Sequence, residues 1–183
     1  MDEFKKKLEA KLAPESVGLT LVRAGCFLSA YELIKTEIVD NVHEFYLTGM
    51  DQGQLQYDEG RYQVEVRQLD PKNIFRASCT WLVHHDALTT EQVAVFEDIR
   101  QHRNQIAHEL PYLLINPDMD VRIDLLLAAI ECVRALGIFW ASIEIATDPI
   151  WAERDIDYDG IKSGPYLLLE YLASLVGIND NNM

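Results

Sequence analysis

The sequence has few cysteines and few basic residues, and it lacks a hydrophobic leader. Its three cysteines, Cys26, Cys79 and Cys132, lie far apart among apolar residues, which favours reduced core residues over a disulfide framework. Its 16 Lys and Arg residues are outnumbered by 30 Asp and Glu residues, and the resulting net charge of −14 argues against binding duplex DNA over a broad basic face. Residues 1–7 lack the apolar stretch of a signal peptide. We expect a soluble, cytoplasmic protein.

Common nucleotide-binding and hydrolase motifs are also missing. The sequence has no glycine-rich phosphate loop and no G-x-S-x-G elbow, which argues against classical nucleotide hydrolysis and serine hydrolase chemistry. The most apolar segment, 121–145, contains five charged residues, which favours a core helix over a membrane helix. They are Arg122, Asp124, Glu131, Arg134 and Glu144. We therefore expect no membrane association.

Apolar residues recur at helical spacing along most of the 183 residues, and the hydrophobic content of 49% is sufficient for one core. We predict one all-α domain, residues 1–183, which forms a helical bundle of four to five main helices. Short connections between the helices favour antiparallel neighbours. The expected helices cover residues 3–12, 17–45, 73–85, 89–110, 120–147 and 165–176.

Capping and breaking residues suggest where these helices begin and end. Ser16 is a candidate N-cap for the long helix that follows, and Gly49 is a candidate stop after it. Thr89 and Gln92 have the spacing of a capping box. Pro111 is expected to end the helix that begins there.

A polar segment around residues 49–72 is expected to form an insertion between helices. Tyr62, Val64 and Val66 alternate within it, which leaves a strand and an ordered loop as alternatives. Asp155–Gly160 matches the first half of a calcium loop, but Tyr166 occupies the position of the bidentate Glu, which favours an acidic surface loop. His84–Asp86 is interpreted as a helix end rather than a metal site.

The predicted helix at 89–110 contains the residues most suggestive of chemistry. Its apolar stripe includes an arginine, Arg103, whose burial is costly unless a partner pairs with it. Asn104 and His108 are four residues apart and share a face, and Glu97 projects in about the same direction. His43 and His102 are expected to be solvated. The apolar positions of the stripe are Val93, Phe96, Ile99, Ile106, Ala107 and Leu110.

The hexapeptide Arg103-Asn104-Gln105-Ile106-Ala107-His108 resembles the R-N-x-x-A-H form of the motif of HEPN domains (higher eukaryotes and prokaryotes nucleotide-binding). The resemblance implies a small helical bundle that dimerises through its motif helices. It also implies a metal-independent endoribonuclease that uses the RNA 2′-hydroxyl as nucleophile and needs no cofactor. Arg103 would stabilise the phosphate charge, His108 would act as general acid or base, and Asn104 would position the scissile group.

The resemblance further implies a role as a toxin or antiviral-defence effector, with an antitoxin or a defence protein as partner. Some toxin members have a modifiable tyrosine two residues after the histidine, where this chain has Leu110. The alternative function is a non-catalytic dimerisation module that binds a nucleotide or a protein. In that module, Arg103 and His108 would be held in internal ion pairs. A plain structural bundle is the third alternative.

Overall fold

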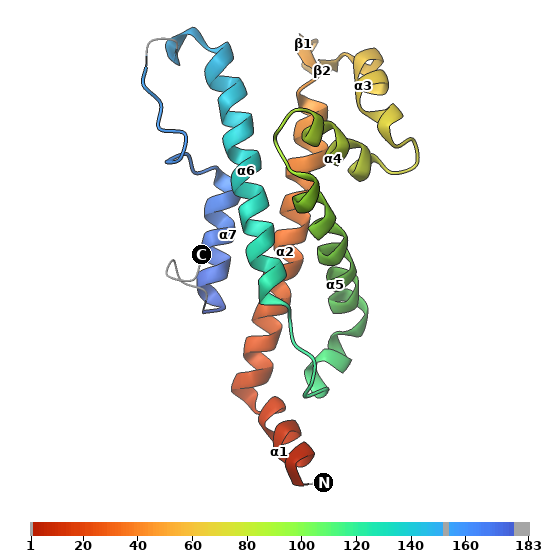
Figure 1. Cartoon of the computed structure of the whole chain (residues 1–183), viewed down its shortest axis with the longest axis vertical. Helices are drawn as coiled ribbons and strands as arrows, with labels where there is room; N and C mark the ends of the chain where they lie inside the picture. Colours follow the sequence, from red (N-terminus) through yellow and green to blue (C-terminus); the bar gives the residue numbers. More distant parts are fainter. Residues whose placement is uncertain (1, 152–153, 178–183) are drawn as a thin grey trace.

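The computed structural model describes residues 2–151 and 154–177, and most of them are helical (Figure 1). The predicted all-α fold is confirmed, with one small hairpin as its only sheet among the described residues. The α-helices are α1 (Asp2–Lys11), α2 (Pro14–Glu44), α3 (Glu59–Glu65), α4 (Ile74–His84), α5 (Thr90–Ile115), α6 (Ile123–Thr147) and α7 (Gly164–Leu175). The strands are β1 (Leu47–Asp51) and β2 (Gln54–Tyr57), and 3-10 turns span Arg67–Leu69 and Pro149–Trp151.

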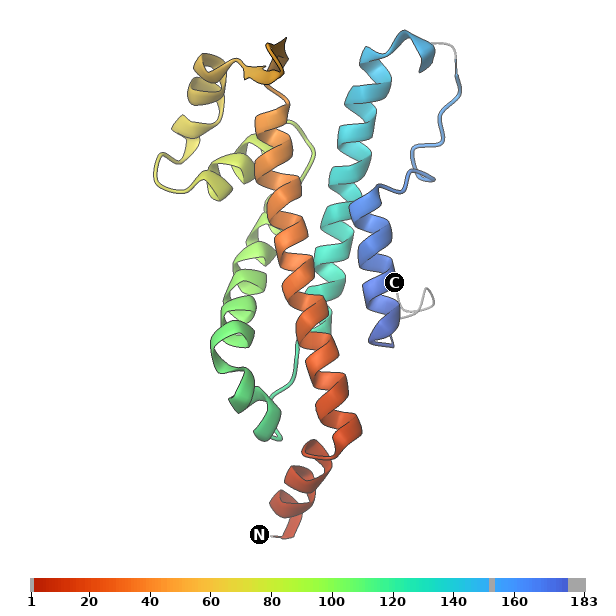
Figure 2. The same ribbon diagram turned by 180° about the vertical axis from the view of Figure 1, so that it is seen from behind.

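The long helix α2 lies at the centre of the bundle and packs against α4, α5, α6 and α7. Figures 1 and 2 show α2 and α6 running in the same direction, with α5 and α7 antiparallel to them on opposite sides. Each fully buried Leu, Ile or Phe contributes about 1.5–3 kcal/mol of transfer free energy to the core. The largest fully buried side chains include Phe27, Ile34, Ile38, Trp81, Leu82, Ile99, Ile106, Leu126, Ile130, Leu136 and Leu169.

The three cysteines are buried and unpaired, as predicted for core residues. Cys26 lies beneath α7, where its thiol donates to the Leu172 carbonyl at 3.5 Å. Burial raises the pKa of both Cys79 and Cys132 to about 12, so both remain protonated thiols at neutral pH.

The predicted start of α2 and the stop assigned to Gly49 were wrong, whereas the predicted end near Phe45 is confirmed. The helix begins at Pro14 rather than after Ser16, and Ala13 is its N-cap residue. Proline suits the first helical position because the N–H that it lacks would have no partner there. The helix ends at Glu44, and Gly49 lies in β1 with φ +154°.

The prediction that Pro111 ends α5 was also wrong, because the helix continues to Ile115. Instead, the helix is kinked at Glu109, which has φ −122° and ψ 19°. Proline causes such a kink because it donates no hydrogen bond and its ring clashes with the carbonyl four residues earlier. At the other end, the predicted capping box is confirmed: Gln92 N donates to Thr89 Oγ1 at 3.2 Å, and Thr89 N donates to Gln92 Oε1 at 2.8 Å.

The polar insertion contains the exposed hairpin, α3 and a 3-10 turn, so the alternating run at Tyr62–Val66 is mainly helical. Tyr62 and Val66 are buried four residues apart, whereas Val64 is exposed. Burial of residues four positions apart fits the inner face of one helical turn. An alternation over only three residues is compatible with both a helical turn and a strand, so the sequence did not decide between them. The hairpin pairs β1 with β2 in antiparallel register.

Helices α2 and α6 are each long and apolar enough to cross a membrane by length and composition alone. The central helices of a soluble bundle meet the same criterion, and these two helices pack against each other here. Cytoplasmic localisation therefore remains a prediction.

Candidate functional site

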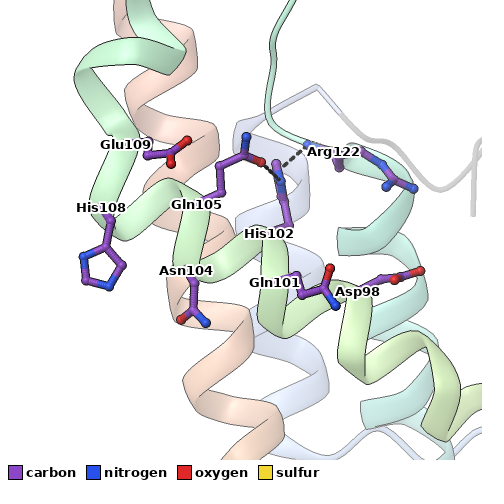
Figure 3. Close-up of a pocket in the computed structure, with 8 residues that line it drawn as sticks. All are labelled: Asp98, Gln101, His102, Asn104, Gln105, His108, Glu109 and Arg122. Carbon is purple, nitrogen blue, oxygen red and sulfur yellow. Dashed lines mark hydrogen bonds between the residues drawn. The ribbon is translucent and has the colours of Figure 1, made fainter.

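The outer face of α5 forms an open hollow of about 500 Å³, bordered at one end by the segment that leads into α6 (Figure 3). Its lining is polar and carries both signs of charge. The lining residues are Asp98, Gln101, His102, Asn104, Gln105, His108, Glu109 and Arg122. Two of the three predicted site residues, Asn104 and His108, lie in this hollow, and Arg103 does not.

Asn104 and His108 project from the same side of α5, one helical turn apart (Figure 3). His108 is exposed and makes no hydrogen bond or ion pair with any other residue that the structure describes. Both ring nitrogens of His108 are therefore open to contact with a ligand. The Asn104 side chain is half-buried, and its Oδ1 accepts a long hydrogen bond of 3.4 Å from Arg103 Nη1.

Arg103 points toward α2 instead of into the hollow. Its Nη2 donates to Glu32 Oε1 at 3.1 Å, and its guanidinium carbon lies 5.3 Å from the centroid of the Tyr31 ring. The Arg103 side chain is 32% exposed, and its Nε is buried without a hydrogen-bond partner. Arg103 is therefore held in position by an ion pair and an aromatic ring, while about a third of its side chain remains exposed.

The prediction that Arg103 occupies the middle of the apolar stripe was wrong. The buried positions of α5 are Phe96, Ile99, His102, Ile106 and Leu113. Arg103 lies beside this row, and Ala107, which was assigned to the stripe, is exposed. The five steps from Arg103 to His108, at 100° per residue, separate their side chains by about 140° around the helix axis. A single protomer thus presents these two side chains on different sides of α5.

His102 is the residue that sequence reasoning missed, because it was expected to be solvated and is buried at 7% exposure. Its Nε2 accepts a hydrogen bond from the Arg122 backbone N–H at 3.0 Å, which places the proton on Nδ1. The Nδ1–H then donates to Gln105 Oε1 at 3.2 Å. The ring packs edge-on against Phe27, and burial lowers the pKa of His102. His102 therefore connects α5 to the first turn of α6 as a neutral imidazole.

Glu97 does not join the predicted cluster. Its carboxylate accepts from Arg100 Nη2 at 2.6 Å and from Gln101 Nε2 at 3.1 Å. The hydrogen bond from Arg100, and to a lesser extent that from Gln101, lowers the pKa of Glu97 to about 2. Glu97 is therefore ionised at neutral pH and pairs with residues of its own helix, not with the predicted cluster.

The other three histidines lie outside the α5 hollow, at a helix end or against aromatic and acidic neighbours. His84 ends α4, as predicted, and His85 stacks on Trp81 with ring centroids 3.8 Å apart. His43 was expected to be solvated but is only partly exposed: its Nε2 lies 3.0 Å from Glu59 Oε1, and its ring stacks on Tyr57. In residues 2–151 and 154–177, no group of three or more His, Cys, Asp or Glu side chains is arranged to hold a metal ion.

The Asp155–Gly160 segment is the exposed acidic turn that the sequence favoured. Asp157 Oδ1 accepts from the Gly160 backbone N–H at 3.2 Å, which closes the turn. A Cβ at position 160 would lie 2.7 Å from Asp157 Oδ2, so this carboxylate packs against the glycine itself.

Comparison with known proteins returned no matching family model, no matching curated sequence and no matching solved structure. The geometry of α5 and its neighbours is therefore the basis for a functional proposal.

Proposed function

We propose that the chain is a metal-independent endoribonuclease whose active site forms between two copies. Arg103, Asn104 and His108 of α5 supply its chemical groups. The supporting observation is the combination of an exposed His108, unpaired among the described residues, in an open polar hollow with an anchored guanidinium on a different side of the same helix. In keeping with the HEPN resemblance, the role is that of a toxin or defence effector restrained by a protein partner.

The chemistry follows from these three side chains. His108 accepts the proton of the RNA 2′-hydroxyl, whose oxygen attacks the adjacent phosphorus, or it donates a proton to the departing 5′-oxygen. The P–O5′ bond breaks, and the products are a 2′,3′-cyclic phosphate and a free 5′-hydroxyl. Arg103 pairs with the charged phosphate oxygens, and the Asn104 amide orients the scissile group.

The angular separation of Arg103 and His108 supports a composite site. Since the two side chains leave α5 about 140° apart, one copy does not aim both at a single phosphate. If two α5 helices meet, Arg103 of one copy can face the same phosphate as His108 of the other.

The surface beside Arg103 is suited to such contact. On α2, Gly18 and Gly25 precede Glu32 at intervals of seven residues, so all three share one helix face. Both glycines are exposed, and a Cβ added at either would meet nothing within 4 Å. The apolar Val22, 43% exposed, lies between them on this face. Small and apolar residues allow a second helix to approach closely, which favours homodimerisation at this face.

The test is RNA cleavage by the purified chain in EDTA, with molecular mass measured by light scattering. We expect a dimer that cleaves RNA, and we expect Arg103→Ala and His108→Ala to lower the rate by at least about 100-fold each. His84→Ala, at the end of α4, is the matched control and should leave the rate unchanged. A dimer that leaves RNA intact, or full activity in both variants, would contradict the proposal.

The Glu32–Arg103 ion pair favours a second candidate, a non-catalytic dimerisation module that binds a nucleotide or a protein. In the nuclease, Arg103 must exchange Glu32 for a phosphate, so Glu32→Gln should strengthen RNA binding and increase cleavage. In the module, the ion pair with Glu32 fixes Arg103 beside the dimer face. Glu32→Gln should then weaken the dimer, and neither the variant nor the wild type should cleave RNA. The two results are opposite in direction.

A further inference from the structure

A second pocket lies far from the α5 hollow, between α2, α6 and the segment that leads into α7. Its volume is about 400 Å³. One wall is formed by the face of α6 that carries Gly137, Trp140, Ala141 and Glu144, and Glu37 and Asn41 of α2 face it. Figures 1 and 2 show that α2 and α6 diverge toward their C-terminal ends, and that the chain after α6 turns back toward α7.

Glu37 lies in the C-terminal part of α2, and its buried carboxyl group has no cationic partner among the described residues. The residue is 7% exposed, and within the part of the chain that the structure describes its side chain accepts one hydrogen bond, from Asn41 Nδ2 to Oε2 at 3.0 Å. Burial, and secondarily the charge of Glu44, raises the pKa of Glu37. A largely buried carboxylate without a counterion is destabilising, so a cationic ligand would relieve this cost.

The nearest basic residue on the pocket wall already has a partner. Lys162 Nζ donates to both carboxylate oxygens of Glu170, at 2.9 and 3.0 Å, and lies 5.5 Å from the centroid of the Tyr166 ring. Lys162 makes no hydrogen bond or ion pair to Glu37, so the Glu37 carboxyl group lines the pocket without a cationic partner among the described residues.

The remaining lining selects the type of cation. Trp140 forms an aromatic wall, and its Nε1 is buried without an acceptor. Glu144, one turn after Trp140, adds a second negative charge at the rim. A divalent metal ion would need more oxygen ligands than this pocket offers, and no metal-binding group is found in the described residues. An aliphatic ammonium ion instead needs a carboxylate acceptor for its N–H groups and an aromatic face for its methylenes.

We infer that the pocket binds a small protonated aliphatic amine, with its ammonium group on Glu37 and its chain against Trp140. This site is separate from Arg103 and His108, and it does not depend on the nuclease proposal. The α6 wall and the N-terminus of α7 meet at Gly137, where an added Cβ would lie 2.7 Å from Ser163 Oγ, so the bound amine would join α2, α6 and the α7 entry.

The test is calorimetric titration of the full chain with putrescine at neutral pH, with sodium chloride at matched ionic strength as the control for screening. We expect saturable binding by putrescine, a change in tryptophan fluorescence and a higher melting temperature, none of which sodium reproduces. Glu37→Gln keeps the shape of the side chain and should weaken binding by at least about tenfold. Glu131→Gln, an exposed position on α6 outside the pocket, should bind as the wild type does.

The absence of saturable heat with the wild type would overturn the inference without any variant. Equal binding by Glu37→Gln would also overturn it, because the amine would then be held by the general negative charge of the chain. Melting curves of Glu37→Gln without amine confirm that it is folded, and we expect it to be at least as stable as the wild type because an uncompensated buried charge is removed.

Discussion

Replacing His102 with leucine should remove a pH-dependent connection between α5 and α6. In the native protein, His102 Nε2 accepts from the Arg122 N–H at 3.0 Å, and Arg122 is the N-cap residue of α6. Leucine is similar in size but offers no acceptor, so the partly buried Arg122 N–H loses its partner. The loss should lower the free energy of unfolding at pH 7.5 by about 1–3 kcal/mol.

The difference in stability between the wild type and His102→Leu should depend on pH, because His102 titrates differently in the folded and unfolded chains. Burial holds the pKa of folded His102 below its ordinary value of 6.5. Below about pH 6.5 the unfolded chain therefore binds a proton that the folded chain resists, and stability falls as the pH decreases. One such proton contributes a slope of at most about 1.4 kcal/mol per pH unit. The variant lacks this proton, so the stability gap between the two proteins should narrow from pH 7.5 to pH 5.5.

Urea denaturation of both proteins, followed by circular dichroism at several pH values, measures this gap directly. His84→Leu is the control, because His84 is an exposed histidine at the end of α4. It should preserve both the stability at pH 7.5 and the slope of the wild type. A stability gap for His102→Leu that stays constant across this pH range, or no gap at all, would refute the role assigned to the neutral imidazole.

Two further predictions concern local packing and capping. Gly137→Ala should destabilise the protein by about 1–3 kcal/mol in urea titrations, because its Cβ would lie 2.7 Å from Ser163 Oγ. Gly60→Ala in α3, whose Cβ would meet only Asp58 Oδ1 at 3.5 Å, should be neutral or stabilising by up to about 1 kcal/mol. Equal effects at both glycines would contradict the close approach of α6 and α7. Thr89→Ala removes the capping box of α5 and should cost about 1 kcal/mol, measured by thermal unfolding; an unchanged melting temperature would show that the cap contributes nothing.

The sequence predicted helices well where a local signal was strong. The capping box at Thr89 and Gln92 and the apolar periodicity of α2 and α6 each depend on residues within one or two turns. The prediction was wrong where two local rules compete. Pro14 and Pro111 have the same covalent restriction, yet Pro14 begins a helix at the first helical position, whereas Pro111 lies inside a helix and accompanies a kink at Glu109.

The candidate site was predicted less completely than the fold. Helical spacing correctly placed Asn104 and His108 on one side of α5. Spacing alone did not identify whether Arg103 or His102 would be buried, because each lies three or four residues from both Ile99 and Ile106. The partners that settle it, Glu32 and Phe27, lie on α2 about 70 residues earlier in the chain. Ile99, His102 and Ile106 follow one another at intervals of three and four residues, which places them on one helix face. This spacing could have predicted that His102 is buried.

The most direct test of a site shared between two copies is complementation between its inactive variants. Arg103→Ala and His108→Ala are mixed under conditions that allow dimers to exchange, and RNA cleavage is measured in EDTA against each variant alone. If Arg103 of one copy acts with His108 of the other, each mixed dimer contains one intact site, so the mixture should recover roughly a quarter of the wild-type activity. If wild-type dimers cleave RNA and exchange is demonstrated, but the mixture remains as inactive as its components, the composite site is contradicted.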